Sequence, residues 1–118
     1  PQDILKARKS MELMYIDENL QDYIVNIVVS TRDPQAFKMG SLKNMIQYGA
    51  SPRASIYLNR AAKAYAFMQG RGHVVPQDIK TIGHDILRHR IITTYEAEAS
   101  GIVSEDLIDR IFDTIPVP

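Results

Sequence analysis

The stretch Gly49-Ala50-Ser51-Pro52-Arg53-Ala54 predicts the start of a helix around which the chain is organised. Ser51 suits the N-cap, because its hydroxyl accepts a hydrogen bond from the free N–H groups of the first turn. Pro52 suits the first helical position, where it has no N–H to leave unpaired. Arg53 is unexpected there, because a cation at the positive end of the helix dipole is disfavoured by about 0.3–1 kcal/mol. Arg53 therefore either points into solvent or meets an anion, such as the phosphates that helix N-termini favour.

Hydrophobic periodicity predicts helices on both sides of this stretch, with Asp17 and Ser104 as N-caps of two of them. We expect helices over 2–9, 18–31, 52–69, 76–88 and 104–115, an extended connector over 11–16 and a long loop over 33–48. The fold class expected is therefore all-α, a small helical bundle of four to five helices. For the central helix the expected inward face comprises Tyr57, Leu58, Ala61, Ala64, Tyr65 and Met68.

Composition narrows the class of protein. The chain has 118 residues, which is one domain's worth, and 45% of them are hydrophobic, which is enough for a core. Fourteen basic and fourteen acidic residues give no net charge, so we do not expect nucleic acid as a partner. Cysteine is absent, which excludes disulfides and thiolate metal sites. No apolar run approaches the length of a membrane span, and we expect a cytoplasmic protein without a membrane partner.

Catalytic motifs are missing from the sequence. The phosphate-binding pattern G-x-x-x-x-G-K-[ST] does not occur, and no apolar strand ends in paired acids that would hold Mg²⁺. The chain alone is therefore expected neither to bind nor to hydrolyse ATP. His73, His84 and His89 lack metal-ligand spacing, so no metal site is expected. His73 is expected at the surface, and His84 is expected to face away from the apolar stripe of its helix.

The basic cluster Arg88-His89-Arg90 has two interpretations. It either caps the C-terminus of its helix or pairs with Glu96 and Glu98 across a subunit or domain boundary. The two glutamates are two residues apart, so on a helix they diverge and do not form a catalytic pair. Arg60, two turns after Arg53, is expected to be structural and paired with an acid.

Four segments in the same order carry a resemblance to a known family. They are the block from Gly49 to Arg60, Leu87-Arg88-His89-Arg90, Tyr95-Glu96-Ala97-Glu98-Ala99-Ser100-Gly101 and Ile115-Pro116-Val117-Pro118. Together they resemble the C-terminal part of MoxR-family AAA+ ATPases, and the likeness runs from about residue 11 to the end. The resemblance implies that Arg53 is the sensor 2 arginine, aimed by Ser51 and Pro52 at the γ-phosphate of bound nucleotide. This assigns Arg53 a catalytic role and assigns all three residues to nucleotide binding.

The resemblance also implies what the rest of the parent protein does. Residues 1–118 would be a single lid domain, a fragment lacking the preceding α/β nucleotide-binding domain, and that domain would hold ATP and Mg²⁺. The parent would be an ATPase that assembles as a homo-hexameric ring. It would have a chaperone-like role in maturation or cofactor insertion, with a von Willebrand factor A-type protein as a possible partner.

Two alternatives stay open at this stage. The long central helix followed by Val75-Pro76-Gln77-Asp78-Ile79 also resembles the second loop and third helix of a histone-fold interaction module, which would dimerise. The chain could instead be the lid of another AAA+ branch, magnesium-chelatase-like or helicase-related. In that case the role of Arg53 would persist while the client changed.

Overall fold

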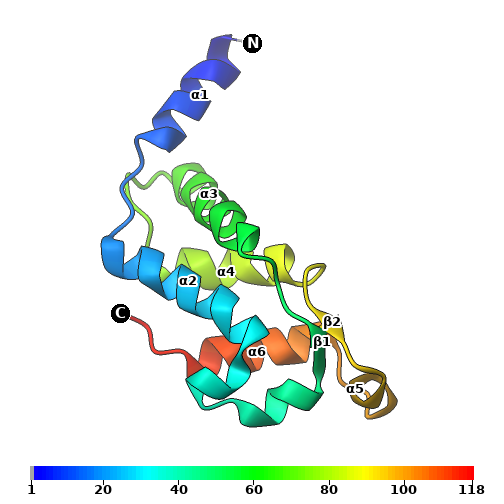
Figure 1. The fold of residues 1–118 in the computed structure, drawn as a ribbon. Coiled ribbons are helices and arrows are strands. Elements are labelled where there is room, and N and C mark those ends of the chain that lie inside the picture. The colour runs from blue at the N-terminus through cyan, green and yellow to red at the C-terminus, as the bar shows by residue number, and fades with distance from the viewer. Residues whose placement is uncertain (1) are drawn as a thin grey trace.

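A computed structural model describes residues 2–118, without the side chains of residues 7 and 10–12. Over these residues the chain forms six α-helices and two short strands, shown in Figure 1. The helices are α1 (Gln2–Glu12), α2 (Glu18–Arg32), α3 (Arg53–Met68), α4 (Pro76–Leu87), α5 (Tyr95–Ala99) and α6 (Ser104–Thr114). The strands are β1 (Ile46–Tyr48) and β2 (Ile92–Thr93). The predicted all-α class is confirmed, and α5 is a helix that the periodicity did not predict.

Helices α2 and α4 form the middle of the bundle. Helix α3 packs on both of them from one side and α6 packs on both from the other, as Figure 1 shows. Helix α1 extends away from the bundle beyond α3, which it contacts. The N-terminal helix is longer than expected, because residues 11 and 12 continue it and do not form a connector.

The expected long loop over 33–48 has structure of its own. It contains the 3-10 helices η1 (Pro34–Phe37) and η2 (Gly40–Asn44), followed by β1. Strand β1 pairs antiparallel with β2, with Ile46 opposite Thr93. Leu42 in η2 is completely buried, so this connection is part of the hydrophobic core.

The inward faces of α2 and α6 are as predicted. The residues of these two faces that lie in the core are Leu20, Tyr23, Ile24, Ile27, Val28, Leu107, Ile108, Ile111, Phe112 and Ile115. Each helix has a regular i, i+3, i+4 spacing of large apolar side chains, which leaves one face to bury. Gly83 of α4 packs directly against the ring of Phe112, so α4 and α6 approach closely at this glycine.

The expected inward face of α3 is wrong except at Leu58. The buried residues are Ala54, Leu58, Ala62 and Ala66, spaced four apart. Met68 is 80% exposed and Tyr57 lies at the surface. Because alanines lie all around this helix, its apolar periodicity does not define a single face, and close approach to α2 and α4 selects the alanine row.

Of the predicted N-caps, Asp17 is confirmed, Ser51 lies one residue before Pro52, the N-cap of α3, and Ser104 is not the N-cap of α6. The Asn19 N–H donates to the side chain of Asp17 at 2.8 Å, which confirms that cap. Gly70 ends the α3 segment with φ of 77°, a left-handed conformation that suits glycine. The cap at Ser104 is wrong: Val103 is the N-cap, and its N–H donates to Asp106 at 3.0 Å. The Ser104 hydroxyl instead donates to the Arg88 carbonyl at 3.3 Å.

Candidate functional site: the N-terminus of helix α3

The three predicted site residues form the entrance to α3. The Arg53 N–H donates to Ser51 Oγ at 3.2 Å, and the Ala54 N–H donates to the Ser51 carbonyl at 2.8 Å. Pro52 already has helical angles, with φ of −53° and ψ of −26°. Ser51, Pro52 and Arg53 are all exposed. The structure therefore brings them together at one helix end, with the Arg53 side chain at the surface.

A contact with α2 fixes the chain just before this helix. The Ala50 N–H donates to Thr31 Oγ1 at 2.8 Å, and the Thr31 hydroxyl donates to the Val28 carbonyl at 2.7 Å. Both Thr31 and Ala50 are buried. Gly49 passes so close to the Thr31 carbonyl that a Cβ on it would collide with backbone atoms. The end of α2 therefore positions the entrance of α3.

Sequence analysis missed Thr31 and the packing role of Gly49. Residues 31 and 50 are 19 positions apart, so no local pattern connects them. A glycine just before a predicted cap is the one local signal, and it does not identify the segment that packs against it.

Acidic side chains do not neutralise the two arginines of α3. Among the side chains that the structure describes, neither Arg53 nor Arg60 forms an ion pair, although four such pairs occur elsewhere. The expected acidic partner of Arg60 is therefore not found. Arg60 instead lines a groove next to α3.

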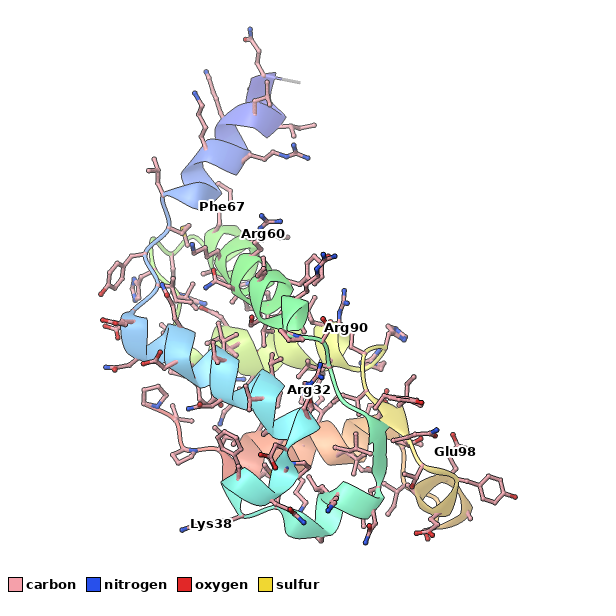
Figure 2. The ribbon with its side chains drawn as sticks, viewed as in Figure 1. Arg32, Lys38, Arg60, Phe67, Arg90 and Glu98 are labelled. Atoms are coloured by element: carbon pink, nitrogen blue, oxygen red, sulfur yellow. The ribbon has the colours of Figure 1, made fainter. Side chains whose placement is uncertain are left out.

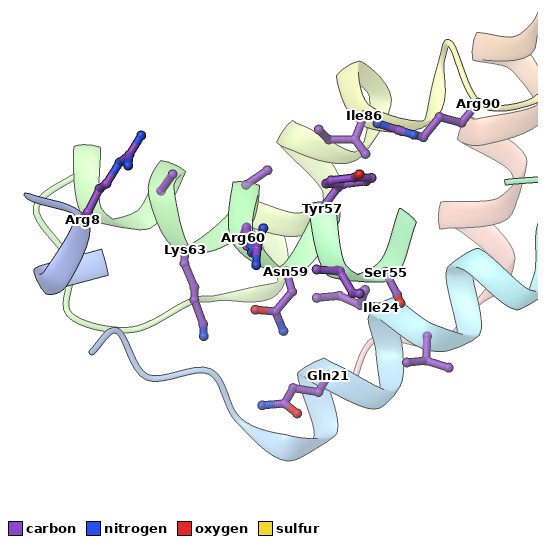
Figure 3. A pocket seen from close by; sticks show the side chains of 14 residues that line it. Arg8, Gln21, Ile24, Ser55, Tyr57, Asn59, Arg60, Lys63, Ile86 and Arg90 are labelled. Carbon is purple, nitrogen blue, oxygen red and sulfur yellow. The ribbon is translucent and has the colours of Figure 1, made fainter. Parts of the chain in front are cut away.

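This groove has a volume of about 850 Å³ and lies between α1, α2, α3 and the end of α4 (Figure 3). Its described basic side chains are Arg8, Arg60, Lys63 and Arg90. Its apolar side chains are Ile24, Val25, Ile56, Tyr57, Ala61, Ala64 and Ile86. The Arg90 guanidinium lies 4.6 Å from the ring centre of Tyr57, which is a cation–π contact.

The basic cluster after α4 has its described ion pairs with residues other than Glu96 and Glu98. Arg88 contacts Asp85 at 3.2 Å and Glu105 at 2.9 Å, so it joins α4 to the start of α6. Arg90 faces the groove, and His89 is exposed. No described side chain of this cluster pairs with these glutamates inside the domain, and the pairing across a subunit or domain boundary stays a prediction.

The expected orientation of His84 is also wrong. Its Nε2 lies 2.5 Å from Asp109 Oδ1, and its ring centre lies 5.5 Å from that of Phe112. His84 therefore bridges α4 and α6. His73 is exposed as expected. Over the described residues, no group of three or more His, Cys, Asp or Glu side chains is arranged to hold a metal ion.

One ion pair at the start of α4 has a buried carboxylate and a partly exposed arginine. Arg71 contacts Asp78, whose second carboxylate oxygen accepts a hydrogen bond from the Val75 N–H at 2.8 Å. Asp78 thus supplies the helix cap that Val75 itself lacks, and its negative charge suits the positive end of the helix dipole. Two tyrosines have altered acidity: the nearby Asp17 carboxylate raises the pKa of Tyr15, and burial raises the pKa of Tyr23.

Comparison with known proteins identifies the family. Residues 42–111 match the family model described as AAA lid domain. Chaperone MoxR1 of Mycobacterium tuberculosis is 37% identical over 98% of this chain, which covers 31% of that protein. Protein MoxR of Methylorubrum extorquens is 38% identical over 66% of this chain, covering 23% of that protein.

A solved structure shares the fold almost completely. A crystal structure from Cytophaga hutchinsonii, of a protein assigned provisionally as an ATPase, superposes with a TM-score of 0.95 and 43% identity. The match covers 99% of this chain and 36% of that one. The chain belongs to the AAA lid domain family and is the C-terminal lid of a MoxR-family AAA+ ATPase. It spans about a third or less of the length of each of these proteins.

A lid domain implies an AAA+ core domain as its partner in the parent protein. The family match favours the lid interpretation over the histone-fold alternative. Among the described helices, none is both long enough and apolar enough to cross a membrane.

Proposed function

We propose that this lid closes over ATP held by the preceding α/β core and that Arg53 contacts the γ-phosphate as the sensor 2 residue. Its guanidinium offers a planar set of donors that matches phosphate oxygens. ATP would hold the lid closed through this contact, and hydrolysis would release it. Ser51 and Pro52 would hold the helix entrance in place, and Mg²⁺ would be bound by the core.

The observation that carries this proposal concerns the start of α3. Its backbone is held in place by α2, and the Arg53 guanidinium has no ion-pair partner among the described side chains. The Thr31–Ala50 hydrogen bond holds the entrance of α3, while Arg53 is exposed and forms no ion pair within the described chain. A cation at a helix N-terminus is electrostatically unfavourable by itself. An anion placed at the same helix end would offset that cost.

At the level of the whole protein, we propose a cytoplasmic homo-hexameric ring that acts as a chaperone in maturation or cofactor insertion, with a von Willebrand factor A-type partner. The name of the Mycobacterium tuberculosis relative, a chaperone, supports the chaperone part of this proposal. The same chemistry at Arg53 would also serve a magnesium-chelatase-like or helicase-related lid, which differs in its client.

The test is ATP turnover by the parent ATPase carrying Arg53→Ala. Loss of one charge-assisted hydrogen bond, worth about 1.5–3 kcal/mol, predicts turnover lowered by about 10- to 150-fold. Arg110→Ala, a change at an exposed arginine on α6, is the matched control and should leave turnover unchanged. Turnover by Arg53→Ala equal to that of Arg110→Ala would contradict the sensor role.

A further inference from the structure

The groove beside α3 is basic along its whole length. In Figure 3, Arg8 and Lys63 lie at one end, Arg60 lies in the middle and Arg90 lies at the other end. No acidic side chain lines the groove among the residues that the structure describes. Arg60, Lys63 and Arg90 form no ion pair within that part of the chain. The charge in the groove is therefore available to a partner.

Although the chain has no net charge, its acidic and basic residues are concentrated in different parts of the fold. No acidic residue occurs between Asp33 and Asp78, a stretch that includes all of α3. The acidic side chains of α5 and α6 are Glu96, Glu98, Glu105, Asp106, Asp109 and Asp113, against a single basic residue, Arg110. Helix α6 lies on the far side of α2 and α4 from α3, and Figure 2 shows Glu98 well away from Arg60. The acidic side chains of α5 and α6 therefore do not neutralise the groove.

The groove is also strongly apolar. Ile56 of α3 is 52% exposed and Val25 of α2 is 46% exposed, and both line the groove. Large aliphatic side chains exposed in a concave surface favour a ligand with apolar side chains of its own. Nucleic acid fits less well, because Tyr57, the one aromatic residue among the described lining, is already covered by Arg90.

The length of the groove favours an extended ligand. It follows α3 from Ser55 to Ala64, a stretch of about 15 Å at the usual helical rise. A single phosphate or a small acid would meet one end of this row of cations. A helix lying along α3 would meet both ends and would fill the space between them with its apolar face.

We propose that this groove is a docking site for an acidic amphipathic helix of a partner protein. The aliphatic stripe of that helix would contact Ile56 and Val25, and its flanking carboxylates would pair with Arg60, Lys63 and Arg90. This site is separate from the nucleotide contact proposed for Arg53, which does not line the groove. It assigns the lid a protein-binding role beyond nucleotide sensing.

The test uses this chain and a fluorescein-labelled helical peptide of about 18 residues, with leucines on one face and glutamates on the others. Binding is measured by fluorescence anisotropy, and backbone amide NMR shifts of the unmutated chain locate the site. We expect saturable binding that weakens as salt rises from about 0.05 to 0.3 M, with shifts confined to the groove. The double change Arg60→Glu and Lys63→Glu should raise Kd at least about tenfold, because it replaces attraction with repulsion. Ile56→Ser should raise Kd severalfold at the same net charge.

Arg110→Glu is the matched control, since it changes the charge at an exposed site on the opposite side of the bundle. It should leave Kd unchanged. The proposal fails if no binding occurs up to about 1 mM peptide, if shifts map elsewhere, or if Arg110→Glu weakens binding as much as the groove variants. It also fails if a single-stranded oligothymidylate binds as tightly, because the groove would then serve nucleic acid.

Discussion

Gly49→Ala should show how firmly α2 holds the entrance of α3. The new Cβ would collide with the carbonyl group of Thr31 and approach the Arg32 nitrogen to 2.8 Å. These are backbone atoms, so no rotation of a side chain can relieve the overlap. The loop must move away from α2, which also lengthens the hydrogen bond between the Ala50 N–H and Thr31 Oγ1.

The cost can be worked out from these two contacts. Overpacking of a close contact costs about 1–3 kcal/mol, and the lost hydrogen bond adds about 1 kcal/mol. Together they predict that the free energy of unfolding falls by about 2–4 kcal/mol. At about 4 °C per kcal/mol for a domain of this size, the midpoint of thermal unfolding should fall by about 8–16 °C.

The assay is urea unfolding followed by circular dichroism, with the m-value compared between variants. Gly72→Ala is the matched control, because a Cβ there would have no neighbour within 4 Å. It should be neutral or slightly stabilising, since alanine restricts the unfolded chain. If Gly49→Ala and Gly72→Ala agree within about 0.5 kcal/mol, the contact between residues 31 and 49 is not tight and the positioning argument fails.

Two further predictions concern the core. Ala62→Leu should destabilise the domain by about 1–3 kcal/mol through overpacking, because Ala62 is fully buried, whereas Ala64→Leu at the groove should cost less than about 0.5 kcal/mol. Equal urea midpoints for the two variants would contradict the assigned inner face of α3. Tyr23→Phe should stabilise by about 1 kcal/mol, because the Tyr23 hydroxyl is buried without a partner among the described residues. Burial raises the pKa of Tyr23, so above pH about 10 the unfolded chain ionises first and wild-type stability falls as pH rises. The fall should be smaller in Tyr23→Phe, and identical pH profiles would refute this assignment.

The sequence by itself determined the helices whose signals are local. Asp17 caps α2, and the large aliphatic residues of α2 and α6 define one face each. The site residues Ser51, Pro52 and Arg53 were also predicted together, since a helix start is encoded by adjacent residues. Such features depend on spacing along the chain, and the structure keeps that spacing.

Only the tertiary structure decided what depends on distant partners. Helix α3 has alanines on several faces, and packing against α2 and α4 selected the row containing Ala54, Ala62 and Ala66. The hydrogen bond between residues 31 and 50 likewise joins two segments whose meeting no local pattern predicts. The groove and its charge arise in the same way, because Arg8, Arg60 and Arg90 come from three separate segments. Close packing chooses among faces that periodicity leaves equivalent, and that choice needs the neighbouring helices.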